Sequence, residues 1–194
     1  PNGAIFADQW NNLDNMMAHY RTTGPEILAQ TNKQIDGFIC SVGTGGTLSG
    51  VSKFLRENKS DIQIGIADPK GAAMYNFFQN NKVEPSAGNS ISEGIGLGRV
   101  TPIIEEIEKV DYCYSIEDID ALHYIYKLVK NEGVILGGSS AINIAGAVNL
   151  AKDIGKGKTI VTILCDHGSR YQSKIYNQKF LKEKKLPVPD WLKN

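Results

Sequence analysis

The sequence predicts an α/β fold, with a mostly parallel sheet and helices on both of its faces, in three α/β/α layers. Residues 35–67 read as strand, glycine-rich loop, helix and strand, an order typical of a parallel βαβ unit. Residues 134–154 repeat this theme, because an apolar run leads through two glycines and two serines into a helix. That helix is apolar nearly all round, which indicates that it is buried.

The first third of the chain is expected to contain two helices after an irregular start. Residues 9–19 are rich in Asn and Asp and weak in apolar periodicity, which favours loop with short helical turns. Residues 23–30 open with Thr-Gly-Pro-Glu, and an early proline is typical of a helix start. Apolar residues recur at helical spacing over residues 48–57, and residues 62–67 are the next buried strand.

The middle of the chain predicts shorter elements around a long loop. Residues 72–79 form a short helix, and residues 85–98 form a loop with four glycines. A loop of this length inside a compact domain is either functional or mobile. Residues 101–102, Thr-Pro, open another short helix, and residues 112–115 form a brief strand.

A capping box is expected at the next helix. Ser115 and Asp118 have its spacing, and the helix should run to about Asn131, where Gly133 ends it. Residues 159–165 are apolar and predict the last buried strand.

Composition narrows the class of protein. The 194 residues allow one domain, and a hydrophobic content of 41% is ample for a core. Lys plus Arg equals Asp plus Glu at 21 each, so no overall field attracts nucleic acid or an anionic membrane, and small molecules or proteins are the expected partners. Three scattered cysteines argue against a disulfide framework and suit a reducing cytoplasm. No apolar run approaches the roughly twenty residues of a membrane span.

The loop that joins the first strand to its helix is a candidate anion site. It consists of Gly43, Thr44, Gly45, Gly46 and Thr47. Glycines let backbone N–H groups approach a ligand, and the start of the following helix points its own free N–H groups and positive dipole end at the same place. The two hydroxyls add donors. We therefore expect a phosphate here.

Several phosphate ligands compete for this loop. A Walker loop needs a lysine that is missing, since Lys53 falls inside the helix, so ATP and GTP are excluded. A dinucleotide fingerprint would need glycine at Leu48, although Asp68 has about the right spacing for its acid, and NAD stays open as an alternative. A tight turn, in which glycine is needed only for backbone geometry, is the remaining alternative, and three glycines and two threonines in five residues disfavour it.

Two other groups of reactive residues predict neither a catalytic triad nor a metal site. Cys165, Asp166, His167 and Ser169 hold the letters of a nucleophilic triad, but triad partners come from distant segments, so a hydrolase is not expected. The three histidines have no metal-ligand spacing, and we expect no metal.

Five motifs, in order along the chain, together resemble the cysteine synthase (O-acetylserine sulfhydrylase) family of fold type II, tryptophan-synthase-like pyridoxal-phosphate enzymes. They are residues 22–27, 43–47, 92–96, 132–140 and 162–171. The resemblance covers essentially the whole chain and is closest to the A type. It implies pyridoxal 5′-phosphate as cofactor and β-replacement as the reaction, in which O-acetyl-L-serine and sulfide give L-cysteine.

The resemblance also implies roles for individual residues. Residues 43–47 would hold the cofactor phosphate, and Ser139 would bond the pyridine nitrogen. Gln9 would approach the substrate carboxylate, and Gly94 would lie beside the substrate. Ser139 could instead only cap its helix, and Asp166 is the acid that could replace it at the nitrogen.

The resemblance reaches only the C-terminal part of the family fold. Residues 1–194 would be the C-terminal, cofactor-phosphate-binding α/β domain of a truncated chain. The family's Schiff-base lysine and its Thr-Ser-Gly-Asn-Thr-type substrate loop have no counterpart here, and the first residue is not Met. We therefore assign no catalytic residue and expect the chain alone to be inactive.

The family implies a homodimer, with serine acetyltransferase as a possible partner. Three alternatives stay open for the function. They are another fold type II β-replacement enzyme similar to cystathionine β-synthase, a non-catalytic phosphate-binding protein, and an NAD-binding α/β domain.

Overall fold

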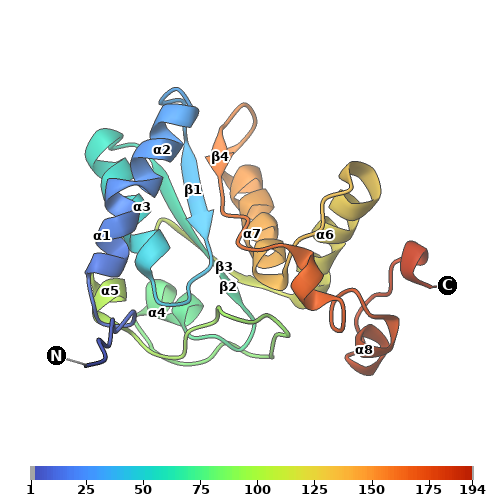
Figure 1. The fold of residues 1–194 in the computed structure, drawn as a ribbon. Helices are drawn as coiled ribbons and strands as arrows, with labels where there is room; N and C mark the ends of the chain where they lie inside the picture. The colour runs from blue at the N-terminus through green and yellow to red at the C-terminus, as the bar shows by residue number, and fades with distance from the viewer. Residues whose placement is uncertain (1–2, 194) are drawn as a thin grey trace.

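The computed structural model describes residues 3–193, which contain one four-stranded sheet (Figure 1). Its strands are β1 (Gly37–Cys40), β2 (Gln63–Pro69), β3 (Tyr112–Ile116) and β4 (Ile160–Val161), in the order β3-β2-β1-β4. All three strand pairs are parallel, with Phe38 of β1 opposite both Ile64 and Val161. The predicted mostly parallel sheet is confirmed.

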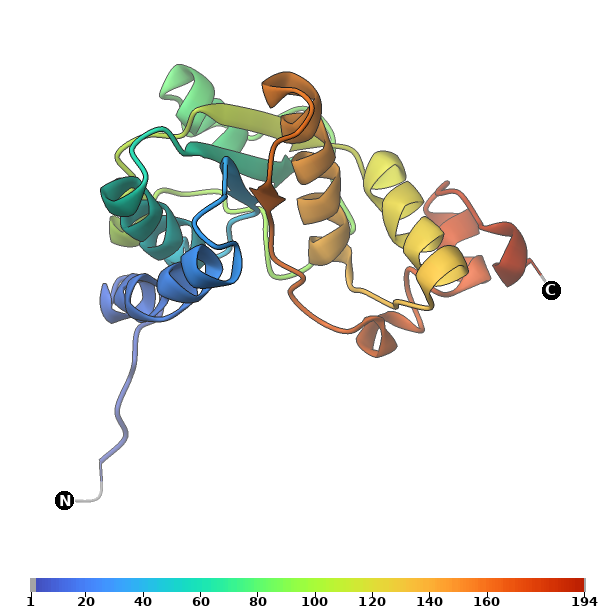
Figure 2. The same cartoon turned by 90° about the horizontal axis from the view of Figure 1, so that it is seen from above.

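Helices cover both faces of the sheet. One core includes side chains of α2, α3, α4 and α5, and the other includes side chains of α6, α7 and α8. Their bounds are α1 Asp14–Arg21, α2 Thr23–Gln30, α3 Gly46–Asn58, α4 Met74–Asn80, α5 Pro102–Glu105, α6 Asp118–Glu132, α7 Gly138–Ile154 and α8 Gln178–Glu183, with 3-10 turns at Gly168–Tyr171 and Asp190–Leu192. Figure 2 shows β1 and β4 between α1–α3 and α7. The three layers are therefore confirmed.

Alternation along β1 explains how one strand serves two cores. Phe38 and Cys40 belong to the core beside α3, while Ile39, between them, belongs to the core beside α7. Successive side chains of a strand point to opposite faces, so a fully apolar strand is buried on both sides. α7 lies close to the sheet, because a side chain at Gly146 would stand 2.5 Å from the Cβ atom of Ala67.

The expectation of loop with short helical turns at residues 9–19 was wrong from residue 14 onward, because α1 occupies Asp14–Arg21. Met16 is the buried residue of this helix, so its sequence shows little amphipathic pattern. Tertiary packing stabilises it instead. A side chain at Gly50 of α3 would overlap the carbonyl oxygen of Met16, so the two helices touch through their backbones.

The predicted capping box was also wrong. Ser115 lies within β3, and α6 has Glu117 at its N-cap without a side-chain capping bond. The carboxylate of Asp118 instead accepts hydrogen bonds from Ser90 Oγ (2.6 Å) and Ile91 N (2.8 Å). Asp118 therefore fastens the long loop at residues 85–98.

The last strand is shorter and less buried than predicted. β4 contains only Ile160 and Val161, both half-buried, at the edge of the sheet. Beyond it, side chains replace the ladder, since Thr162 Oγ1 donates to Ile39 O (2.6 Å) and Asn143 Nδ2 donates to Ile163 O (2.7 Å). No helix among residues 3–193 is long and apolar enough to cross a membrane.

Candidate functional site

A cavity of about 510 Å³ lies beyond the carboxyl end of β1, where parallel α/β sheets bind their ligands. Its volume suits a small-molecule ligand. Its lining includes every residue singled out from the sequence: Gln9, Gly43, Thr44, Gly45, Gly46, Thr47, Gly94 and Ser139. The structure thus brings together residues from four distant parts of the chain.

The loop at residues 43–47 leaves backbone donors free. Gly45 is the N-cap of α3 and has φ +100°, a left-handed conformation that favours glycine. Within residues 3–193, the amides of Thr44, Gly45, Thr47 and Leu48 find no protein acceptor. They stand at the start of a 13-residue helix, where N–H groups and dipole attract an anion. The loop therefore fits a phosphate group.

Helix α1 contacts both hydroxyls of this loop. Asn15 Nδ2 donates to Thr44 Oγ1 (2.9 Å), and His19 Nε2 lies 3.2 Å from Thr47 Oγ1. His19 Nδ1 lies 3.0 Å from Thr23 Oγ1. Burial lowers the pKa of His19, which favours the neutral ring with one donor and one acceptor nitrogen.

The long loop that carries Gly94 closes one side of the cavity. A side chain at Gly43 would stand 2.6 Å from the carbonyl oxygen of Gly94, so the two backbones touch. Gly96 N donates to Val42 O (3.1 Å), and Asp118 holds the other part of the loop. Gly94 itself has φ +75° and would point a side chain into open space.

Ser139 presents a hydroxyl to the same cavity. It is 5% exposed. The N-cap of α7 is Gly137, which makes no side-chain capping bond, so Ser139 and Ser140 lie inside the first turn. Ser140 Oγ accepts from Cys165 N (2.8 Å). The alternative that a serine caps this helix was therefore wrong.

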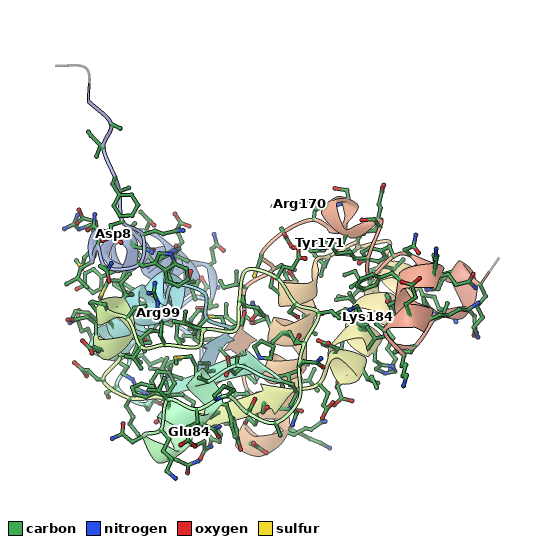
Figure 3. The ribbon with its side chains drawn as sticks, turned by 90° about the horizontal axis from the view of Figure 1, so that it is seen from below. Asp8, Glu84, Arg99, Arg170, Tyr171 and Lys184 are labelled. Atoms are coloured by element: carbon green, nitrogen blue, oxygen red, sulfur yellow. The ribbon has the colours of Figure 1, made fainter. Side chains whose placement is uncertain are left out.

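Asp166 lines the same cavity beside Gly137. Its Oδ2 accepts from Tyr171 Oη (2.8 Å) and lies 3.8 Å from Arg170 Nη1, while its buried Oδ1 has no partner within residues 3–193. Burial and the bond to Asp166 raise the pKa of Tyr171 to about 12. Figure 3 shows Arg170 and Tyr171 near each other at the upper edge of the view.

Asn143 was missed by sequence reasoning. It is 1% exposed in the middle of α7; its Oδ1 accepts from Ser41 N (2.6 Å) and its Nδ2 donates to Ile163 O. It therefore fixes the carboxyl end of β1 against the segment after β4. A polar residue inside an apolar helix was the feature that could have revealed it.

Asp68, the acid that an NAD site would need, is fully buried. Its Oδ2 accepts from Tyr75 N (2.8 Å), at the start of α4. Burial raises its pKa to about 6. Asp68 thus holds a helix and is not free to bind a ribose. In the described part of the chain, no cluster of three His, Cys, Asp or Glu side chains could bind a metal.

Comparison with known proteins agrees with this geometry. The profile of the family described as "Pyridoxal-phosphate dependent enzyme" matches residues 1–166. Cysteine synthase 1 of Neurospora crassa is 38% identical over 97% of this chain and 52% of its own length. Cysteine synthase of Dictyostelium discoideum is 39% identical over 96% of this chain and 52% of its own length.

A solved structure, an O-acetylserine dependent cystathionine beta-synthase from Helicobacter pylori, superposes with a TM-score of 0.75 at 31% identity. The match covers 86% of this chain and 51% of that one. The chain spans about half the length of the relatives it matches. It belongs to the family of pyridoxal-phosphate dependent enzymes.

Proposed function

We propose that this chain binds the phosphate and pyridine ends of pyridoxal 5′-phosphate in an enzyme that makes L-cysteine from O-acetyl-L-serine and sulfide. One observation carries the proposal. A single cavity is lined both by the loop with free backbone N–H groups and by the buried Ser139. Cysteine synthases at 38% and 39% identity support the choice of reaction.

Each group in the cavity has a separate task in this proposal. The amides and hydroxyls of residues 43–47 bind the phosphate, and Ser139 shares a neutral hydrogen bond with the pyridine nitrogen. The side chain of Gln9 binds the substrate carboxylate, and Gly94 leaves room for the substrate. When bound, the cofactor supplies an electron sink for charge at the substrate α-carbon.

The neutral partner at the nitrogen bears on the type of reaction. A carboxylate there would keep a proton on the ring nitrogen, whereas the hydroxyl of Ser139 does not. Charge at the α-carbon is then relieved by expelling a β-leaving group, which suits acetate as the group replaced. Asp166, in the same cavity, is the residue that competes for this position.

The chain alone is proposed to be inactive. Among the described residues that line the cavity, none is a lysine, so the amine that reacts with the cofactor has to come from another part of the enzyme. The family resemblance further supports residues 1–194 as the C-terminal domain, a cytoplasmic homodimer and serine acetyltransferase as a partner.

Cystathionine formation is the second candidate. The structural neighbour from Helicobacter pylori carries that activity in its description, with O-acetylserine as a substrate. The two candidates share the first substrate and differ in the incoming thiol, which is sulfide for one and homocysteine for the other.

The experiment titrates the purified chain with pyridoxal 5′-phosphate and then joins the chain to the N-terminal half of a related cysteine synthase. Saturable cofactor binding without turnover is expected for the chain, and cysteine formation from O-acetylserine and sulfide for the joined protein. Turnover by the chain alone would refute its proposed inactivity. A joined protein that uses homocysteine in place of sulfide would select the second candidate.

A further inference from the structure

Asn15 connects two parts of the cavity lining that the sequence treated separately, Gln9 and the loop at residues 43–47. Its Nδ2 donates one proton to Gln9 O (2.8 Å) and the other to Thr44 Oγ1 (2.9 Å). A side-chain amide nitrogen has two protons, so both bonds form at once. Asn15 thereby ties the segment before α1 to the anion loop.

The bond from Asn15 determines which way the Thr44 hydroxyl can act. Thr44 Oγ1 accepts from Asn15 Nδ2 and, more weakly, from Gly46 N (3.4 Å). A hydroxyl has two acceptor positions and one donor proton. With both acceptor positions filled, the proton of Thr44 remains for a third group, and a group with acceptor oxygens such as a phosphate matches it.

The fit between Asn15 and the loop also explains a glycine. A side chain at Gly46 would overlap Asn15 Oδ1, so Asn15 lies directly against the backbone of the loop. His19, one helical turn further along α1, contacts Thr47 in the same manner (3.2 Å). One face of α1 therefore contacts both threonines of the loop.

We propose that Asn15 is a positioning residue that directs the Thr44 hydroxyl proton to a phosphate ester and holds the Gln9 segment in register with it. The inference rests on the proposed function, because it takes the phosphate of the cofactor as the ligand. It extends that function to α1, which contributes to anion binding without touching the anion.

The test is the variant Asn15→Asp, which keeps the shape and reverses the bond. A carboxylate accepts the Thr44 proton, repels the Gln9 carbonyl and adds a negative charge near the anion. Affinities are measured for inorganic phosphate, for pyridoxine 5′-phosphate and for pyridoxine, which has no phosphate. We expect Asn15→Asp to weaken both phosphate ligands at least tenfold and pyridoxine less than twofold.

Asn12→Asp is the matched control, because it adds the same charge at an exposed asparagine three residues away. We expect all its affinities to stay within twofold of wild type. Asn15→Ala, which removes the donor without adding charge, should give a smaller, phosphate-specific loss of about threefold. It decides the matter if Asn15→Asp does not fold, as judged by urea unfolding.

Equal losses for pyridoxine and its phosphate would mean a merely structural role and would overturn the inference. An Asn15→Asp affinity for phosphate within twofold of wild type would overturn it as well, while leaving the proposed function intact. A wild-type chain that binds neither phosphate ligand would instead refute the proposed function and, with it, this extension.

Discussion

Two turns of similar sequence meet at the cavity and differ in the groups that lie beside them. Both the loop at residues 43–47 and the turn at residues 137–140 place glycines and hydroxyls at the start of a helix. In the second turn, Gly137 N donates to Asp166 O (3.1 Å) and Ser140 accepts from Cys165 N. In the first, four backbone amides have no acceptor within residues 3–193.

The difference shows that glycine and serine content locates a close backbone approach without defining the ligand. The segment after β4 binds Gly137 N and Ser140 Oγ of the second turn, but the amides of Gly138, Ser139 and Ser140 have no acceptor within residues 3–193 either. No such segment covers the first loop, where helix start and left-handed glycine direct several N–H groups to one place. The carboxylate of Asp166 lies beside Gly137 of the second turn, where it disfavours an anion, so the first turn is the one suited to a phosphate.

The largest difference in cofactor affinity between the two turns should appear when one methyl group is added to each of them. Gly45→Ala forces a side chain into φ +100° with its Cβ atom 2.9 Å from Ile104 Cδ1. We expect a loss of about 2 kcal/mol, roughly 30-fold in pyridoxal 5′-phosphate affinity. Gly138→Ala, whose nearest neighbour would be 3.7 Å away, should stay within twofold. Equal losses of cofactor affinity in the two variants, measured by equilibrium titration, would contradict the difference between the two turns.

Ser140→Ala should destabilise the fold and leave the anion loop unaffected. It removes the acceptor of Cys165 N, so the free energy of unfolding should fall by about 1–3 kcal/mol. Urea unfolding measures this change, and phosphate affinity serves as its control. A variant as stable as wild type would show that the bond is dispensable.

Ser139→Ala should have a smaller effect, confined to ligands with a pyridine ring. Loss of one hydrogen bond should cost about 1 kcal/mol, roughly fivefold in affinity for pyridoxal 5′-phosphate. The affinity for inorganic phosphate should not change. If Asp166→Asn weakens cofactor binding more than Ser139→Ala does, Asp166 is the partner of the nitrogen.

The smallest effect is a pH dependence at the anion loop. Burial lowers the pKa of His19 below its usual 6.5, so below pH 6.5 the unfolded chain takes up a proton more readily than the folded chain. The contribution of the neutral His19 ring to stability is fully present above pH 6.5 and is lost as the pH falls through the lowered pKa of the folded chain. His19→Gln should flatten the plot of unfolding free energy against pH in this range. His123→Gln, at an exposed site of α6, should leave that plot unchanged. An unchanged slope in His19→Gln would contradict this origin.

The sequence predicted what local patterns determine. Apolar spacing placed α3 and β2 within about two residues, and glycine predicted the end of α6, where Gly133 has φ +67°. Tertiary contacts decided the rest. α1 depends on backbone contact with Gly50, and β4 ends early because side chains replace its ladder.

The candidate site was predictable where a motif carries its own geometry. The residues 43–47 follow from glycines that open a helix, and Ser139 follows from the family resemblance; all of them line one cavity. Asn15 and Asn143 were not predictable, because each acts through partners distant in sequence, such as Thr44 for Asn15 and Ser41 for Asn143. Their side chains position the site, and only the folded chain shows it.

The central claim is that the loop at residues 43–47 binds phosphate through its backbone. A titration of the ¹⁵N-labelled chain with inorganic phosphate, followed by amide chemical shifts, tests it most directly. The account predicts saturable shifts concentrated on the amides of Thr44, Gly45, Thr47 and Leu48, with little change at Ser139 and Ser140. Shifts that centre on residues 137–140, or none at the loop, would contradict it.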